Sequence, residues 1–157
     1  MKKKVIISAC LLGEMCRYDG QMKRDDKIVN ALSKCEIIPF CPEAPLFGTP
    51  RERINVIHKN GQNRIITDET NIDVTQLLHD EINRFILLHP NADTIILKSK
   101  SPSCGIGTTP IYNEEKESVS MGNGIAAEMF LNTFSDTKIY DEHNFISSKL
   151  VINPTIF

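Results

Sequence analysis

Three short apolar runs, each leading into a cysteine, constrain the fold of this 157-residue chain more than any other feature. The runs begin at residues 5, 37 and 94, and the cysteines that follow them are Cys10, Cys41 and Cys104. Such runs are typical of buried strands, and a loop rich in Gly, Pro or Ser adjoins each cysteine. In an open α/β sheet the carboxyl ends of the strands border the ligand crevice. We therefore expect three thiols at one sheet edge, where they could bind a metal or cluster and leave a position open for substrate.

Strand and helix signals alternate along the chain. Apolar runs predict strands over residues 4–9, 36–40, 94–98 and 137–140, and a hairpin over 53–58 and 63–67 across Asn60-Gly61. Helices are predicted from Asp25 or Asp26 to about Ser33, from Asp73 to before Pro90, and from Gly124 to about Leu131. Pro39 favours an edge position for its strand. The alternation predicts an α/β fold: a single compact domain over residues 1–157 with a mostly parallel, Rossmann-like sheet flanked by helices.

Composition excludes several classes of protein. A hydrophobic fraction of 41% and a charged fraction of 24% are those of a soluble globular chain, and no segment has the roughly 20 apolar residues of a membrane span. The net charge of -2 and the scattered basic residues indicate no nucleic-acid binding and favour a small neutral or anionic ligand. Five cysteines without a secretory signal argue against a disulfide framework and predict a reducing cytoplasm.

The end of the chain forms an apolar extension over residues 143–157, which includes Phe145 and Leu150. This segment is too apolar for a free tail, because exposed apolar surface is unfavourable in water. We expect it to cover the core or to pair with another subunit, and the sequence leaves the oligomeric state open.

Glu43 is a candidate general base. It follows Cys41 by two residues across Pro42, in a loop with three prolines in ten residues that restricts where its side chains point. A carboxylate held beside a substrate can activate water. A surface position on a proline-rich loop is the alternative.

Several other residues have two possible roles. Arg17 and Tyr18 suit either gripping a planar polar ring or bracing their loop, and Arg51 either orients a carboxylate or meets solvent. Cys16 lies in a loop that could curl back toward the site, whereas Cys35 is expected to pack as a small hydrophobe.

The cysteines alone allow classes of protein other than an enzyme. A cluster- or metal-binding module could sense redox state or carry electrons, but such carriers favour closely spaced C-x₂-C ligands that this chain lacks. A thiol-based redox protein using Cys10 and Cys16 would lack the usual C-x-x-C motif. A zinc hydrolase is weakened because no histidine has ligand spacing; the four are His58, His79, His89 and His143.

Six motifs occur in a characteristic order from residue 8 to residue 105. They are Ser8-Ala-Cys-Leu-Leu-Gly13, Cys16-Arg-Tyr-Asp-Gly20, Cys41-Pro-Glu43, Thr49-Pro-Arg51, Ile72-Asp-Val-Thr75 and Ser101-Pro-Ser-Cys-Gly105. With them the chain resembles the thiouracil desulfidase family. The family commonly follows Cys-Pro-Glu with paired glycines, where this chain has Ala44-Pro-Leu-Phe-Gly48, so we expect a differently shaped pocket wall.

The resemblance implies a compact α/β domain that holds a [4Fe-4S] cluster through Cys10, Cys41 and Cys104 and leaves the fourth iron without a protein ligand. It implies non-redox desulfuration of a thiolated nucleobase, in which the open iron polarises the C=S bond as a Lewis acid and water attacks the ring carbon. Glu43 matches the carboxylate expected to activate that water, and Ser101 matches the hydroxyl expected to orient the substrate. The products that the resemblance implies are uracil and sulfide.

Overall fold

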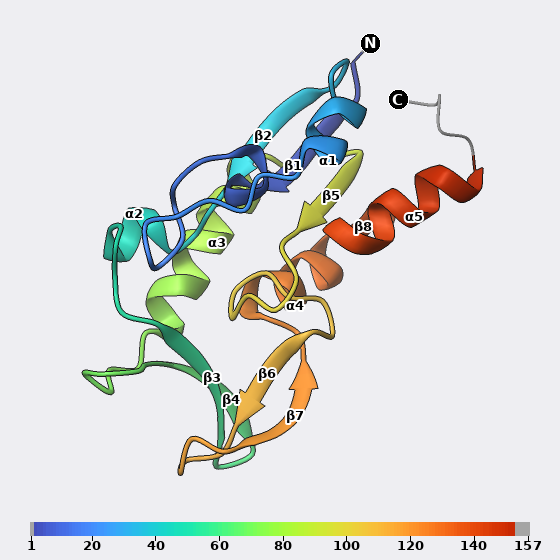
Figure 1. The fold of residues 1–157 in the computed structure, drawn as a ribbon. Coiled ribbons are helices and arrows are strands. Elements are labelled where there is room, and N and C mark those ends of the chain that lie inside the picture. The colour runs from blue at the N-terminus through green and yellow to red at the C-terminus, as the bar shows by residue number, and fades with distance from the viewer. Residues whose placement is uncertain (1, 153–157) are drawn as a thin grey trace.

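The computed structural model describes residues 2–152, and its strands form two four-stranded sheets (Figure 1). The first, sheet A, has the order β2-β1-β5-β8, and all of its neighbouring strands are parallel. Its strands are β1 (Lys4–Ser8), β2 (Glu36–Phe40), β5 (Thr94–Leu97) and β8 (Lys138–Asp141). The predicted mostly parallel sheet is confirmed here, and β2, which contains Pro39, lies at the edge.

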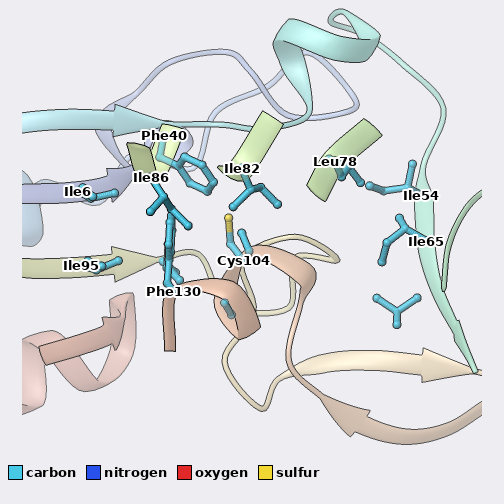
Figure 2. Packing of buried hydrophobic residues seen from close by; sticks show 14 of the residues in the cluster. Ile6, Phe40, Ile54, Ile65, Leu78, Ile82, Ile86, Ile95, Cys104 and Phe130 are labelled. Carbon is cyan, nitrogen blue, oxygen red and sulfur yellow. The ribbon is translucent and has the colours of Figure 1, made fainter. Parts of the chain in front are cut away.

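Helices cover both faces of sheet A, because alternate residues of its central strands point to opposite sides. From β1, Ile6 packs in one core cluster with Leu78, Ile82 and Ile86 of α3 (Thr75–Leu88), as Figure 2 shows, and with Phe130 of α4 (Ile125–Thr133). Val5 and Ile7 belong to the second cluster, which contains Ile28 of α1 (Asp26–Ala31) and Phe145 of α5 (Glu142–Ile152). The predicted flanking helices are therefore present.

Two helices begin at residues that favour a helix start. The side chain of Asp25 accepts a hydrogen bond from the Ile28 N–H at 3.2 Å and caps α1. Helix α4 begins after Gly124, where a side chain would meet the Ser103 carbonyl carbon at 2.5 Å. The start of α4 is thus held against the loop that carries Cys104.

A second sheet, sheet B, has the order β4-β3-β6-β7. Strands β3 (Ile54–Lys59) and β4 (Gln62–Thr67) form the predicted hairpin, with Asn60 and Gly61 at φ 52° and 76°. Strands β6 (Thr109–Tyr112) and β7 (Ser118–Gly122) form another hairpin, and β6 pairs in parallel with β3. The sequence does not predict this hairpin, because β7 is exposed almost throughout and has no buried alternating face.

Two short elements adjoin the strand ends of sheet A: the 3₁₀ helix η1 (Ala9–Leu12) after β1 and α2 (Ala44–Phe47) after β2. Phe145 of the C-terminal extension is 1% exposed and packs in the second core cluster. The side chains of residues 149–152 and all of 153–157 lie outside the described residues. Among residues 2–152, no helix is both long enough and apolar enough to cross a membrane.

Candidate functional site

The carboxyl ends of three strands of sheet A bring Cys10, Cys41 and Cys104 to one cavity of about 540 Å³. Cys10 lies in η1 after β1, Cys41 directly follows β2, and Cys104 lies in the loop after β5. Sheet B lines the same cavity through residues of β3 and β6. The chain therefore places three thiols between its two sheets, at the edge where the sequence predicts them.

Burial and hydrogen bonding together give these thiols different acidities. Burial raises the pKa of Cys10 to about 11, although Arg17 and Lys98 oppose this. Burial also raises the pKa of Cys104, which belongs to the first core cluster (Figure 2). By contrast, a hydrogen bond with the Cys16 thiol lowers the pKa of Cys41 to about 7. Cys41 is thus the thiol most readily deprotonated.

Cys16 is a fourth thiol in the cavity. Its loop curls back, so that the Cys41 Sγ lies 3.8 Å from the Cys16 carbonyl oxygen. The hydrogen bond with Cys41, together with burial, raises the pKa of Cys16. Cys35 instead packs against the second core cluster, as the sequence predicts for a small hydrophobe.

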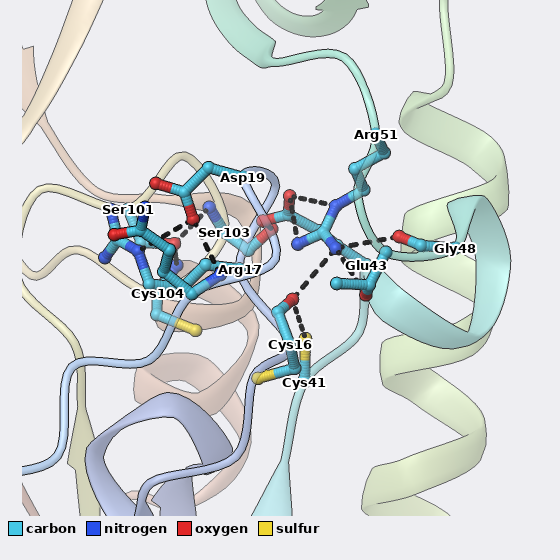
Figure 3. A network of polar contacts seen from close by, with 12 residues as sticks. Cys16, Arg17, Asp19, Cys41, Glu43, Gly48, Arg51, Ser101, Ser103 and Cys104 are labelled. Atoms are coloured by element: carbon cyan, nitrogen blue, oxygen red, sulfur yellow. Dashed lines mark hydrogen bonds and ion pairs between the residues drawn. The ribbon is translucent and has the colours of Figure 1, made fainter.

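Glu43 lies beside the thiols and is 8% exposed, so the surface alternative for it is wrong. Its Oε1 accepts hydrogen bonds from Arg51 Nε at 3.4 Å and Nη2 at 3.3 Å, and its Oε2 accepts one from Ser103 Oγ at 2.7 Å (Figure 3). The Arg51 side chain is 5% exposed and also donates to the Cys16 carbonyl oxygen at 2.8 Å. Arg51 therefore orients a carboxylate, that of Glu43, rather than meeting solvent.

Ser101 organises the loop that carries Cys104. Its Oγ accepts hydrogen bonds from the backbone N–H groups of Ser103 and Cys104, each at 3.1 Å. No described residue accepts the hydrogen of the Ser101 hydroxyl, which lines the cavity and can donate to a ligand. Ser103 has no exposed surface and was not singled out from the sequence, because one serine in a Ser-Pro-Ser-Cys stretch looks like another.

Basic side chains dominate the charged lining of the cavity. They are Arg17, Lys23, Arg51, Arg53, Lys98 and Lys100, whereas Glu43 is the one acidic residue among the lining residues that the structure describes. In a chain with a net charge of -2, this gathering produces a positive local potential that favours an anionic group.

The loop that carries Cys16 holds Arg17 and Tyr18 at the cavity. The Arg53 guanidinium lies over the Tyr18 ring, 4.7 Å from its centroid, and donates a hydrogen bond to the Tyr18 hydroxyl. Arg17 Nε is buried and has no hydrogen-bond partner among the described residues; its contact with Asp19 is an ion pair at 3.9 Å. A ligand with an acceptor atom would satisfy this donor.

The donor set suits an iron–sulfur cluster, because thiolates are the usual ligands of such clusters. Among residues 2–152, no three His, Cys, Asp or Glu side chains form a site for a single metal ion. Cys10, Cys41 and Cys104, in a cavity with an unsatisfied arginine donor, fit an iron–sulfur cluster.

Comparisons with known proteins agree with this chemistry. The family model for 2-thiouracil desulfurase matches residues 5–142. The uncharacterized protein YbbK of Bacillus subtilis (strain 168) is 31% identical over 134 residues, which is 80% of this chain and 87% of that protein. The solved structure of the [4Fe-4S]-dependent thiouracil desulfidase TudS is similar with a TM-score of 0.72 and 33% identity, over 96% of this chain and 97% of that one.

Proposed function

Since the chain belongs to the 2-thiouracil desulfurase family, we propose that it removes sulfur from a thiolated pyrimidine such as thiouracil, with a [4Fe-4S] cluster held by Cys10, Cys41 and Cys104. The observation that carries the proposal is the convergence of these thiols with Glu43 at one cavity. The reaction is a hydrolysis: water supplies the oxygen that replaces sulfur on the ring carbon, and sulfide leaves without a change in oxidation state.

When bound, the cluster would supply an iron without a protein ligand, a Lewis acid that polarises the C=S bond. Three protein thiolates would leave one of four irons open, and Cys16, the fourth thiol at the cavity, is the residue that could close it. The basic lining would attract the negative charge that develops on the substrate.

Glu43 takes the proton from the attacking water in this proposal. Its Oε1 is held by Arg51 and its Oε2 by Ser103, so the carboxylate keeps one orientation at the cavity. Ser101 donates its hydroxyl hydrogen to a polar atom of the pyrimidine ring and so orients the ring, while its oxygen accepts the two backbone hydrogen bonds. The cytoplasm, which keeps thiols reduced, is the compartment that we propose for this chemistry.

Replacement of individual cysteines tests the ligand set. We expect Cys10→Ser, Cys41→Ser and Cys104→Ser each to lose the cluster absorbance and about four irons per chain after anaerobic reconstitution. Cys35→Ser is the matched control, because Cys35 does not line the cavity, and it should keep both. Loss of iron in Cys16→Ser together with retention in one of the three would reassign the ligands.

Sulfide release from 2-thiouracil, 4-thiouracil and their nucleosides tests the reaction. We expect the reconstituted chain to release one sulfide for each uracil formed. A fully loaded chain that releases none from any of these compounds would favour the cluster-binding module over the enzyme.

A further inference from the structure

Two of the four cysteines in the cavity, Cys16 and Cys41, contact each other. The Cys41 thiol donates a hydrogen bond to the Cys16 carbonyl oxygen at 3.8 Å, and the interaction between the two side chains is the largest cause of the pKa shift of each thiol. Figure 3 draws their sulfur atoms close together. Among the described residues, no hydrogen bond joins Cys10 or Cys104 to Cys41. The thiol-based alternative weighed from the sequence paired Cys10 with Cys16, whereas the contact that the structure shows is between Cys16 and Cys41.

The chain around Cys16 is irregular, although Arg51 donates a hydrogen bond to the Cys16 carbonyl oxygen at 2.8 Å. Residues 13–25 contain turns but no helix or strand, and Cys16 is half-buried. Cys41, in contrast, directly follows β2 and precedes α2. A disulfide needs its sulfur atoms at about 2.05 Å. The irregular segment, rather than sheet A, would supply the approach of the two sulfur atoms.

We infer that Cys16 and Cys41 are a modification site: in the cluster-free chain they form an intramolecular disulfide, which withholds Cys41 from iron until it is reduced. The oxidant is a low-molecular-weight disulfide such as oxidised glutathione. One protein thiolate attacks it and releases one glutathione, and the second protein thiol then displaces the other. Two protein thiols are oxidised, one disulfide is reduced to two glutathione thiols, and these take up the two protons.

The site is consistent with a reducing compartment, in which disulfides are usually transient and redox-sensing. The block on cluster loading rests on the proposed function, because it requires Cys41 to be a ligand. The disulfide itself does not depend on desulfuration, so the two can fail separately.

The test uses the full chain in two forms, cluster-loaded and stripped of iron with a chelator, each exposed to oxidised glutathione without oxygen. In the stripped chain, titratable thiols should fall by two, from five to three, with a mass loss of about 2 Da for the two hydrogens removed. Peptide mapping should find Cys16 joined to Cys41. The loaded chain should keep them unlinked, and dithiothreitol should restore iron uptake to the oxidised chain.

Two variants test whether the disulfide requires Cys16. Cys35→Ser should form the same link, whereas Cys16→Ser should form no intramolecular disulfide. Mapping of the wild-type chain decides the matter even if a variant folds poorly. A link between any other pair of cysteines, or five thiols remaining in the oxidised stripped chain, would overturn the inference.

Discussion

Two sides of the cavity differ in how completely their polar groups are paired. On the Glu43 side, made by Glu43, Arg51 and Ser103, both carboxylate oxygens accept hydrogen bonds and each group is almost fully buried. On the loop side, made by Cys16, Arg17 and Tyr18, Arg17 Nε is buried without a hydrogen-bond partner among the described residues. The Glu43 side is complete without a ligand, and the loop side is not.

The two sides therefore suit different steps of the reaction: the Glu43 side suits the chemical step and the loop side suits substrate binding. Donors and acceptors fixed before the reaction cost no reorganisation when charge develops, which suits the Glu43 side to the chemical step. A buried donor without a partner costs about 1–3 kcal/mol, and a ligand that supplies an acceptor recovers that cost. The loop side therefore suits binding. Substitutions on the two sides should accordingly affect different kinetic constants.

The largest effect is expected from Glu43→Gln. The amide keeps the shape of the side chain but cannot take a proton from water, so kcat should fall about 10²- to 10⁴-fold while cluster absorbance is retained. Sulfide release at saturating thiouracil measures this. Glu52→Gln is the matched control, since Glu52 does not line the cavity and bonds Thr70 instead. Normal turnover in Glu43→Gln would remove this side from the chemical step.

Arg51→Met should destabilise the fold by about 3 kcal/mol, because removal of one partner leaves the other charge of a buried pair unpaired. Urea unfolding of the reduced, iron-free chain measures it. In the Glu43→Gln background the same substitution should cost clearly less, since the charge that Arg51 balances is gone. Equal losses in both backgrounds would show that Arg51 acts through the Cys16 and Gly48 carbonyls rather than through Glu43.

The sequence predicts where the thiols and Glu43 lie better than it predicts which residues pair with them. Apolar runs that lead into cysteines locate the strand ends, and Cys41-Pro-Glu43 places a carboxylate there, because both signals are local. The partners of Glu43 are Arg51 and Ser103. Ser103 lies sixty residues further along the chain than Glu43, so this pairing depends on how distant segments pack. The contact of Cys16 with Cys41 and the hairpin of β6 and β7 are likewise products of tertiary packing.

Arg17→Met tests the loop side. The substitution removes a donor that only a ligand would satisfy, so the KM for thiouracil should rise about tenfold with kcat little changed, as expected for one charged hydrogen bond. The free energy of unfolding should not fall, and should rise by up to about 1–3 kcal/mol, because the substitution removes a buried donor that has no partner in the ligand-free chain. A fall in kcat at constant KM would instead place Arg17 in the chemical step.

The smallest effect is expected from a second buried ion pair that lies outside the proposed chemistry. Glu142 of α5 faces Lys98 at 2.8 Å and His143 at 3.9 Å, and it also accepts a hydrogen bond from the Ser99 N–H. Burial alone would raise the pKa of Glu142, but the hydrogen bonds from Lys98 and Ser99 lower it below its ordinary value of 4.5. The carboxylate therefore stabilises the fold above that pH, and the contribution is lost as pH falls through the lowered pKa.

Glu142→Gln should consequently be less stable than wild type at neutral pH, and the gap in the free energy of unfolding should narrow as the solution is acidified below pH 4.5. Urea unfolding at a series of pH values measures the gap, and sulfide release at neutral pH should stay near that of wild type. A constant gap would mean that shape rather than charge accounts for the role of Glu142. A loss of turnover as large as that of Glu43→Gln would show that burial of any ion pair at this cavity, rather than the position of Glu43, is what the reaction requires.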